Sequence, residues 1–357
     1  MAGRDGDMKS SRLRIAYFPF ENRSNRYTDN FKKILSHFGE VHEAPPLKRV
    51  LLKLDFRRYD VLILNWTDNS FVNARKGTVS VPGIVKEFFR IGVYKLIARK
   101  TVFVRHNVYP HDAIGPARVK ATRIVARYER CFDLCWVHSG HMVEAHRCYV
   151  PHPLYEVGQA ATALPAGLTL PEKYFVVFGR IQSYKRIDRL VEMLPPDLHV
   201  LVCGTCPDPA YRKELESFGK PNVTIMAEFI SDELARALIV RSSGMLICHA
   251  EDDMIVSGSI VFAISLGVPV FAVETPFITW FRDAVNENMI VAATDFADLI
   301  GRMRAQQSQI AAVDVACSQS HFSDQSVIAH VATTFDRLEL TSNRGDAAPR
   351  MHIEEVK

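Results

Sequence analysis

Short apolar runs alternate with helix-like segments along most of the chain. Runs of this kind, bounded by polar residues, are typical of strands buried on both faces of a parallel sheet. In the first half of the sequence they cover residues 13–20, 59–65, 101–105 and 134–138. Residues 27–38 carry apolar side chains at helical spacing. This alternation predicts a doubly wound α/β domain.

The same alternation restarts after residues 155–172, which are rich in Ala, Gly and Pro and suit a linker. Predicted strands there cover 174–178, 199–203, 223–226, 244–248 and 268–273, with helices near 185–194, 208–218, 232–241, 258–266 and 276–284. We expect a first domain over 1–154, a second over 173–320, a C-terminal helix over 321–341 and a disordered tail over 342–357. Two joined α/β domains leave a cleft that suits a ligand.

The composition is that of a globular protein with a large core. Of the 357 residues, 48% are hydrophobic and 24% are charged, which excludes collagen-like and wholly disordered chains. No apolar run is long enough for a membrane helix and the chain starts with a polar stretch, so we expect a cytoplasmic protein. The seven cysteines are scattered and predict reduced thiols, with Cys203 and Cys206 structural rather than a redox pair.

Positive charge is concentrated in the first half. Residues 1–150 contain 27 basic and 14 acidic side chains, whereas the rest contains 17 and 26. Clustered positive charge suits nucleic acid, an anionic membrane or a phosphate-bearing substrate, and it also occurs on solvated surfaces of uneven charge. Nucleic acid is the weakest of these, because no aromatic stacking stripe or known module accompanies the charge. Residues 82–100 mix apolar and basic side chains, as in a membrane-interface helix or an ordinary amphipathic helix packed on the sheet.

Two segments of the second half are candidates for binding a diphosphate. Gly179 ends a predicted strand, and Arg180 and Lys185 follow it at the sheet edge where α/β proteins bind ligands. Ser257, Gly258 and Ser259 precede an apolar helix, whose N-terminus favours anions. The acids from Glu251 to Asp253 lie just upstream, where they can bind sugar hydroxyls or be solvated. Without a ligand, both segments are ordinary strand-to-helix turns.

One loop of the basic half is equipped for acid–base chemistry. The segment Arg105–Asp112 follows a predicted strand and carries His106, His111 and Asp112, which are groups able to act as a general base near neutral pH. The same three residues could ligate zinc, but a fourth ligand with familiar spacing is missing, so we expect no metal.

The order of these segments resembles glycosyltransferases of the GT-B architecture, with two facing Rossmann-like domains, over nearly the whole chain. FGRIQSYKRIDRLVEML is similar to the first donor-phosphate motif of that group, and SGSIVFAISLGVPVFAVETPF to its second donor-side helix. Asn65-Trp66 and HNVYPHD add a nearer resemblance to the xanthan-type β-1,4-mannosyltransferases of bacterial exopolysaccharide biosynthesis. That resemblance implies GDP-mannose as donor, a lipid-diphosphate-linked oligosaccharide as acceptor and peripheral contact with the cytoplasmic face of the inner membrane.

One departure from the GT-B pattern bears on stereochemistry. Retaining family-4 enzymes carry a Glu-x7-Glu motif before a G-x-P turn. Here Met254 and Phe262 occupy the two glutamate positions ahead of Gly267. Glu251 replaces the first glutamate only after a shift of three residues. The loss of both acids favours an inverting enzyme, in which an acceptor-side group deprotonates the attacking hydroxyl directly.

The resulting hypothesis is an inverting glycosyltransferase that needs neither metal nor cofactor. Asp112 is our first candidate for the base, with His106 and Asp68 as alternatives. Donor binding is assigned to Gly179, Arg180, Lys185, Glu251, Ser257, Gly258 and Ser259, and acceptor binding to Asn22, Arg23, Asn25, Asn65, Trp66 and Asn107. The alternatives are a UDP-sugar-dependent glucosyl- or glucuronosyltransferase and a non-catalytic protein that binds nucleotide sugars.

Overall fold

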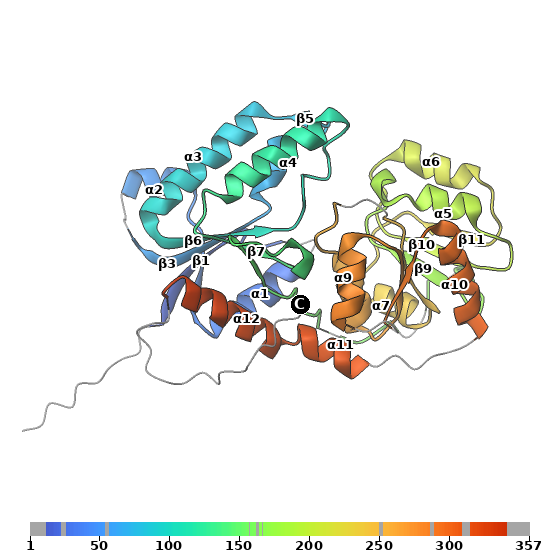
Figure 1. Cartoon of the computed structure of the whole chain (residues 1–357). Helices are drawn as coiled ribbons and strands as arrows, with labels where there is room; N and C mark the ends of the chain where they lie inside the picture. The colour runs from blue at the N-terminus through green and yellow to red at the C-terminus, as the bar shows by residue number, and fades with distance from the viewer. Residues whose placement is uncertain are drawn as a thin grey trace, which may run out of the picture.

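The chain forms two α/β domains, each built around a six-stranded parallel sheet (Figure 1). In this computed structural model the described residues are 12–22, 26–53, 57–156, 158–161, 164–165, 167–249, 253–285, 289–308 and 315–340. The tail predicted over 342–357 lies outside them.

The first sheet has the order β2-β1-β3-β6-β7-β8, and every neighbouring pair is parallel. Its strands are β1 (Leu13–Phe18), β2 (Gly39–Glu43), β3 (Tyr59–Asn65), β6 (Ala98–Arg105), β7 (Leu134–Val137) and β8 (Arg147–Tyr149). The connecting elements are α1 (Tyr27–Ser36), α2 (Leu47–Lys53), η1 (Thr67–Phe71), the hairpin β4 (Val72–Asn73) and β5 (Thr78–Val79), α3 (Val81–Ile97), α4 (Pro116–Glu129) and η2 (Gly140–Met142).

The second sheet has the order β11-β10-β9-β12-β13-β14 and is also parallel throughout. Its strands are β9 (Phe175–Phe178), β10 (Val200–Cys203), β11 (Val223–Met226), β12 (Gly244–Ile247), β13 (Val270–Val273) and β14 (Ile290–Ala293). The helices are η3 (Ser183–Lys185), α5 (Ile187–Met193), α6 (Pro209–Ser217), α7 (Asp232–Val240), α8 (Gly258–Ser265), α9 (Pro276–Val285) and α10 (Phe296–Ser308).

Two C-terminal helices tie the domains together below the sheets in Figure 1. The ring of Phe322, at the end of α11 (Val315–Phe322), stacks on Phe281 of the second domain at 5.2 Å between centroids. The next helix, α12 (Asp324–Arg337), returns to the first domain, where Phe335 packs on Phe38 at 5.1 Å. The chain therefore crosses between the domains twice.

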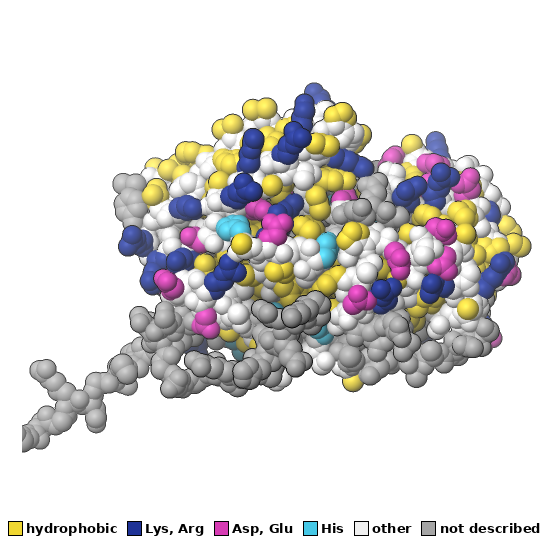
Figure 2. All heavy atoms as spheres, viewed as in Figure 1, with side chains coloured by type: hydrophobic (Ala, Val, Ile, Leu, Met, Phe, Trp, Pro, Cys, Tyr) yellow, Lys and Arg dark blue, Asp and Glu magenta, His cyan; other side chains and the backbone are white. Residues whose placement is uncertain are grey.

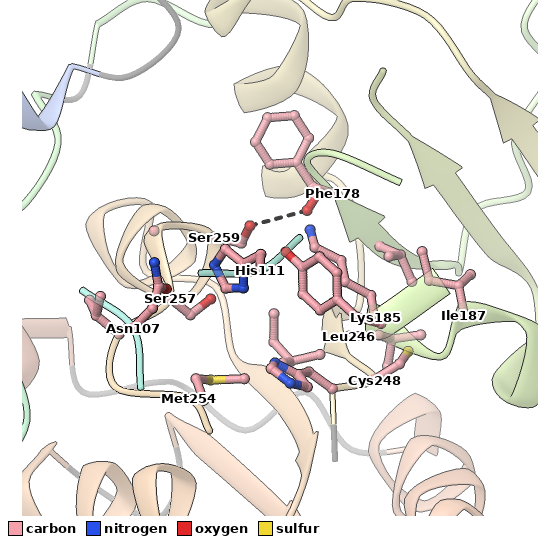
Figure 3. Close-up of a pocket in the computed structure, with 16 residues that line it drawn as sticks. Asn107, His111, Phe178, Lys185, Ile187, Leu246, Cys248, Met254, Ser257 and Ser259 are labelled. Carbon is pink, nitrogen blue, oxygen red and sulfur yellow. Dashed lines mark hydrogen bonds between the residues drawn. The ribbon is translucent and has the colours of Figure 1, made fainter. Parts of the chain in front are cut away.

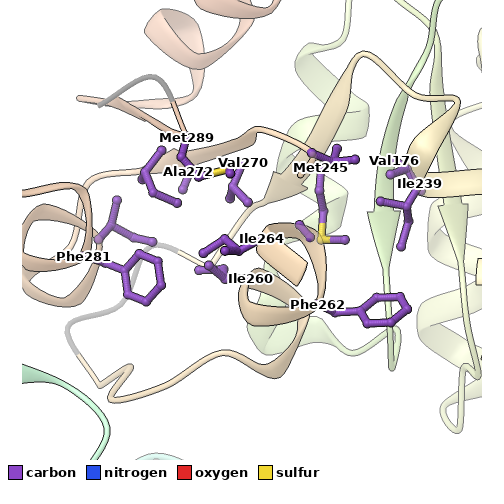
Figure 4. Close-up of a cluster of buried hydrophobic side chains, with 14 of the residues drawn as sticks. Val176, Ile239, Met245, Ile260, Phe262, Ile264, Val270, Ala272, Phe281 and Met289 are labelled. Atoms are coloured by element: carbon purple, nitrogen blue, oxygen red, sulfur yellow. The ribbon is translucent and has the colours of Figure 1, made fainter. Parts of the chain in front are cut away.

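One of the two hydrophobic clusters in the core of the second domain surrounds α8 (Figure 4). Residues 260–265 of this helix are all buried, as expected of a helix that is apolar on every side. Burial of the whole helix body leaves its N-terminal turn as the part that reaches a surface.

Five strands were not predicted from the sequence: the two-residue strands β4 and β5, and the strands β2, β8 and β14 of the large sheets. The strands β2, β8 and β14 each lie at the edge of a large sheet. β2 (GEVHE) and β8 (RCY) lack the apolar run of a central strand, whereas β14 (IVAA) is a short apolar run that was missed. The segment predicted as one amphipathic stretch over 82–100 is divided, because α3 ends at Ile97 and β6 begins at Ala98. Among the described residues, no helix combines the length and apolarity needed to span a bilayer.

Candidate active site

A cavity of about 180 Å³ lies at the carboxyl edge of the second sheet. β9 pairs with β10 on one side and with β12 on the other, so the chain order reverses between β9 and β12. A parallel sheet opens a crevice at such a reversal, and ligands bind there. The walls of the cavity come from both strands, from the N-terminus of α8 and from two residues of the first domain, Asn107 and His111 (Figure 3).

Glycine at position 179 leaves room for the lysine that lines this cavity. Gly179 has a φ of +109°, a conformation that side chains other than glycine rarely adopt. A Cβ atom at this position would lie 3.1 Å from Ser259 Oγ and 3.4 Å from Lys185 Nζ. The turn η3 brings Lys185 back toward the end of β9, so the ammonium group lies beside the glycine backbone.

In the described part of the chain, no carboxylate lies close enough to the Lys185 ammonium group to influence its pKa. Burial lowers its pKa to about 8; the nearby Cys248 thiol opposes this shift, and the Arg180 guanidinium adds to it. A buried ammonium group is costly unless an anion compensates it. The side chain therefore favours an anionic ligand in the cavity.

This pKa predicts a pH-dependent affinity for nucleoside diphosphates. The charged ammonium attracts the diphosphate, and in the free protein it loses its proton above a pH of about 8. We expect the affinity for the diphosphate to fall above that pH, by up to about tenfold per pH unit. Calorimetric titrations from pH 7 to 9.5 test this, with Lys185→Met as a control that lacks the dependence. An unchanged parent affinity across that range would contradict the assignment.

The N-terminus of α8 supplies a second anion-binding feature. Ser257 caps the helix, accepting from the Ile260 N–H at 3.4 Å, and Ser259 Oγ donates to the Phe178 carbonyl at 3.2 Å (Figure 3). Both serines and Gly258 line the cavity. The first N–H groups of a helix have no partner within it and carry the positive end of its dipole. A phosphate in the cavity can accept from them.

A buried ion pair holds the loop that the first domain extends over the cavity. Arg105 donates to Glu129 Oε2 at 2.9 Å and to the carbonyls of Asn107 and Val108 at 3.1 Å each. Arg147 donates to the other oxygen, Glu129 Oε1, at 2.6 Å. The loop after β6 therefore leaves the sheet in a defined direction, toward the second domain.

This loop contacts the second domain at the cavity. The backbone of Asn107 forms an antiparallel bridge with that of Met254. The ring of His111 stacks on Tyr184 with centroids 5.0 Å apart and an angle of 9° between the planes. Burial lowers the pKa of His111, which favours the neutral ring at pH 7. The two domains thus complete the cavity together.

Asp253 lies beside the cavity on the loop before α8. Its carboxylate Oδ1 is 2.8 Å from His249 Nε2. Burial alone would raise the pKa of Asp253, but the adjacent His249 ring and the Tyr109 hydroxyl outweigh that effect and lower it. Since Tyr109 belongs to the loop of the first domain, this carboxylate also connects the two domains.

A second reversal of strand order lies in the first sheet, between β1 and β3. Asn65, at the end of β3, donates from Nδ2 to the Phe18 carbonyl at 3.0 Å, and its Oδ1 lies 3.1 Å from His106 Nε2. Since the amide oxygen accepts, Nε2 of His106 carries the proton. Trp66, in a left-handed conformation, stacks on His106 at 4.4 Å. Burial lowers the pKa of His106, so this ring is neutral.

The structure distributes the candidate residues unevenly. Lys185, Asn107 and the Ser257–Ser259 turn line the cavity, whereas Arg180 and Asp112 are exposed and lie outside its lining. Asp68 is only 1% exposed, and burial raises its pKa to about 6. Asn22 is half-buried just after β1. The candidates Arg23, Asn25 and Glu251 lie outside the described residues.

Several lining residues were not assigned from the sequence. They include Tyr184, His249 and Met254, and also His111, which was considered as a general base or zinc ligand but was not among the assigned site residues. Tyr184 stands between Arg180 and Lys185 in the sequence, and this position was the one available signal. Met254 and His111 gave no such signal, because their contacts join segments that are far apart in the sequence.

The two positions where retaining enzymes carry glutamates hold no acid. Phe262 is buried in α8, and its ring centroid lies 5.5 Å from that of Phe178 and 5.6 Å from that of Tyr155. Figure 4 shows Phe262 within the hydrophobic core. Met254 lines the cavity. Within the described part of the chain, no group of three or more His, Cys, Asp or Glu side chains is arranged to hold a metal ion.

Solved structures share this arrangement of two domains. HepE from Anabaena, in complex with UDP-glucose, matches with a TM-score of 0.59 at 13% identity, over 91% of this chain and 100% of HepE. A glycosyltransferase from Rickettsia africae matches with a TM-score of 0.58 at 11% identity, over 94% of this chain and 100% of that one. The chain has the GT-B fold. This confirms the predicted fold class.

A third similar structure is longer than this chain. TarM from S. aureus, in complex with fondaparinux, α-GlcNAc-glycerol and UDP, matches with a TM-score of 0.56 at 12% identity. The match covers 80% of this chain and 57% of TarM. Comparison of the sequence with protein-family profiles and with curated proteins gives no match.

Proposed function

We propose that this protein is a glycosyltransferase that moves a sugar from a nucleoside diphosphate sugar to a hydroxyl of a lipid-linked glycan. One observation carries the proposal: Lys185 and the N-terminus of α8 converge on one cavity, which a loop of the other domain completes. A lysine and a helix N-terminus suit a diphosphate, and a cleft between two domains suits a reaction between two substrates. The similar GT-B structures in complex with UDP and UDP-glucose support the same substrate class.

The proposed reaction forms one bond and breaks one. The acceptor oxygen bonds to the anomeric carbon of the donor sugar while the bond from that carbon to the diphosphate oxygen breaks. The hydroxyl proton passes to a base of the protein. Negative charge grows on the departing diphosphate, where the Lys185 ammonium and the first N–H groups of α8 stabilise it. In this proposal these groups supply the electrostatic stabilisation without a metal or cofactor.

We propose Asp112 as the base. It is exposed on the loop that also carries His111, so an incoming hydroxyl can approach it, whereas Asp68 is closed to solvent. His106 is buried beneath Trp66 with one nitrogen engaged by Asn65. Trp66, Asn107 and Asn22 would then face the acceptor, and the fully buried Asn65 would act indirectly by holding the His106 ring beneath Trp66.

The donor sugar and stereochemistry follow from the sequence resemblance. The similarity to xanthan-type mannosyltransferases of exopolysaccharide biosynthesis favours GDP-mannose, with a UDP-sugar as the alternative. Met254 and Phe262 in place of two glutamates favour inversion and a β linkage. The resemblance further favours an acceptor held at the cytoplasmic face of the inner membrane, with the protein bound there peripherally.

A product assay tests this function. The protein is incubated with GDP-mannose or UDP-glucose and a lipid-linked oligosaccharide fraction, and the anomeric proton of the product is observed by NMR. We expect a β-linked product from one donor and about 100-fold slower transfer by Asp112→Asn, with unchanged donor affinity. Diphosphate binding without a product from any donor would favour a non-catalytic nucleotide-sugar binder, and an α-linked product would exclude inversion.

A further inference from the structure

One aromatic stack joins the two domains at the edge of the cavity. The rings of His111, from the first domain, and Tyr184, from the second, have centroids 5.0 Å apart and planes that differ by 9°. Both residues line the cavity, and His111 is also exposed to solvent. The stack therefore stands between the cavity and bulk water.

Each ring is the sequence neighbour of a group that the proposed reaction uses. His111 precedes Asp112, the proposed base, and Tyr184 precedes Lys185, the proposed cation for the diphosphate. Tyr184 and Lys185 belong to the same three-residue turn, η3. A contact between the two rings therefore links the base to the cation across the domain boundary.

The turn that carries Tyr184 is tightly closed. The Lys185 N–H donates to the Gln182 carbonyl at 3.0 Å, and the Arg186 N–H donates to the Ser183 carbonyl at 2.9 Å. Arg186 has a φ of +55°, which residues other than glycine rarely adopt and which persists only where the surrounding structure imposes it. The turn thus presents its tyrosine and its lysine in one fixed geometry.

A pair of mostly buried side chains supports the stack from within the second domain. The ring of His249 meets that of Tyr184 edge-on, with centroids 5.4 Å apart and an angle of 74°. Nε2 of His249 lies 2.8 Å from Oδ1 of Asp253, and these side chains are only 8% and 15% exposed. A carboxylate at this distance holds an imidazole ring in one orientation. The contacts therefore continue from Asp253 through His249 and Tyr184 to His111.

The loop of the first domain meets the second domain at two more places. The backbone of Asn107 forms a bridge with that of Met254, and the Tyr109 hydroxyl lies close enough to Asp253 to lower the pKa of its carboxyl group. The two domains also touch along their boundary on the face shown in Figure 2. The stack is thus the last contact of the loop before the proposed base.

We propose that Tyr184, supported by His249 and Asp253, is a positioning residue that holds the loop of the first domain closed over the donor. The closed loop places the proposed base beside the acceptor hydroxyl and keeps bulk water from the anomeric carbon. The role in sugar transfer rests on the proposed function, whereas the hold on the loop does not.

An open loop is expected to admit water in place of the acceptor. The water oxygen then bonds to the anomeric carbon while the bond from that carbon to the diphosphate oxygen breaks. The products are the free sugar, the nucleoside diphosphate and a proton. Loss of the stack should therefore slow sugar transfer and increase the share of donor that is hydrolysed.

Hydrogen exchange of the whole chain tests the hold on the loop. Tyr184→Leu removes the ring, whereas Tyr184→Phe keeps it. We expect the amides of residues 107–112 to exchange roughly three- to tenfold faster in Tyr184→Leu, the effect of losing one aromatic pair, and to exchange at the parent rate in Tyr184→Phe. Asp253→Asn, which removes the charge beside His249, is expected to act in the same direction as Tyr184→Leu.

Trp280→Leu is the matched control, because it removes another aromatic contact between the domains. Trp280 of α9 packs on Tyr149 of the first domain at 5.3 Å and does not line the cavity. We expect residues 107–112 to keep the parent exchange rate in this variant. Parent-like exchange in Tyr184→Leu, or an equal rise in Trp280→Leu, would overturn the proposal. Circular dichroism confirms that each variant is folded.

The fate of the donor gives a second readout. We expect Tyr184→Leu to lower kcat for transfer by about tenfold or more, with a larger share of free sugar and a donor Kd within about threefold of the parent. Tyr184→Phe should restore the parent values. A weaker donor Kd with an unchanged ratio of free to transferred sugar would overturn the positioning role. If the parent transfers no sugar while loop exchange follows the pattern above, the proposed function fails and the hold on the loop stands.

Discussion

Replacing Lys185 with alanine is expected to lower kcat/KM for the nucleotide sugar by about 10²–10³-fold. The ammonium group lines the cavity and has no carboxylate among the electrostatic neighbours that the structure describes. The charge that develops on the departing diphosphate would lose its nearest side-chain cation, and removing one such preorganised donor typically has an effect of this size. Steady-state kinetics with varied donor concentration measure it.

Arg180→Ala provides the matched comparison. Arg180 belongs to the same turn but is exposed and lies outside the cavity lining, so solvent screens its contribution. We expect it to lower kcat/KM by less than about tenfold. Equal losses for the two variants would show that the diphosphate lies at the mouth of the cavity rather than beside Lys185.

Replacing Glu129 with alanine is expected to lower the free energy of unfolding by about 3–5 kcal/mol. The carboxylate is 4% exposed and accepts from both Arg105 and Arg147, at 2.9 and 2.6 Å. Its removal leaves the Arg105 guanidinium, itself 2% exposed, buried without a counter-charge. Denaturant unfolding followed by tryptophan fluorescence measures the change, with Trp280→Phe as the background so that only Trp66 and Trp136 of the first domain contribute.

Glu144→Gln tests whether the burial of the Glu129 ion pair causes the expected loss of stability. Glu144 also pairs with Arg147, at 2.9 Å, but its side chain is 66% exposed, and an exposed pair contributes at most about 1 kcal/mol. We expect a small change for this variant. If Glu129→Ala and Glu144→Gln lowered the free energy of unfolding by similar amounts, the loss would come from the ion pairs of Arg147. It would not come from leaving the buried Arg105 without a counter-charge.

The central strands could be predicted from the sequence because buried parallel strands need continuous apolar runs. The predicted bounds of Tyr59–Asn65 agree with those of the central strand β3, and the predicted strand over 199–203 differs by one residue from the central strand β10. The edge strand β2, with the sequence GEVHE, lacks that signal because its outer side meets water. Its pairing with β1 is a tertiary contact that no local pattern encodes.

The candidate site shows the same limit. Lys185 and the Ser257–Ser259 turn were predicted because strand ends and helix starts carry local signals that parallel topology brings to one edge. Tyr184 was missed because its ring contacts His111 of the other domain. Asp112 and His111 are adjacent in the sequence, and only the direction of the loop, set by Arg105, decides which of them reaches the cavity.

The most direct test of the account is a thermal-shift measurement of the parent and Lys185→Ala with GDP, UDP, ADP, TDP and their common sugars. A ligand that binds only the folded state raises the Tm. We predict that one nucleoside diphosphate and its sugar raise the Tm of the parent and leave that of Lys185→Ala nearly unchanged. No shift of the parent at saturating nucleotide, or an equal shift in both proteins, would contradict a nucleotide-sugar site in this cavity.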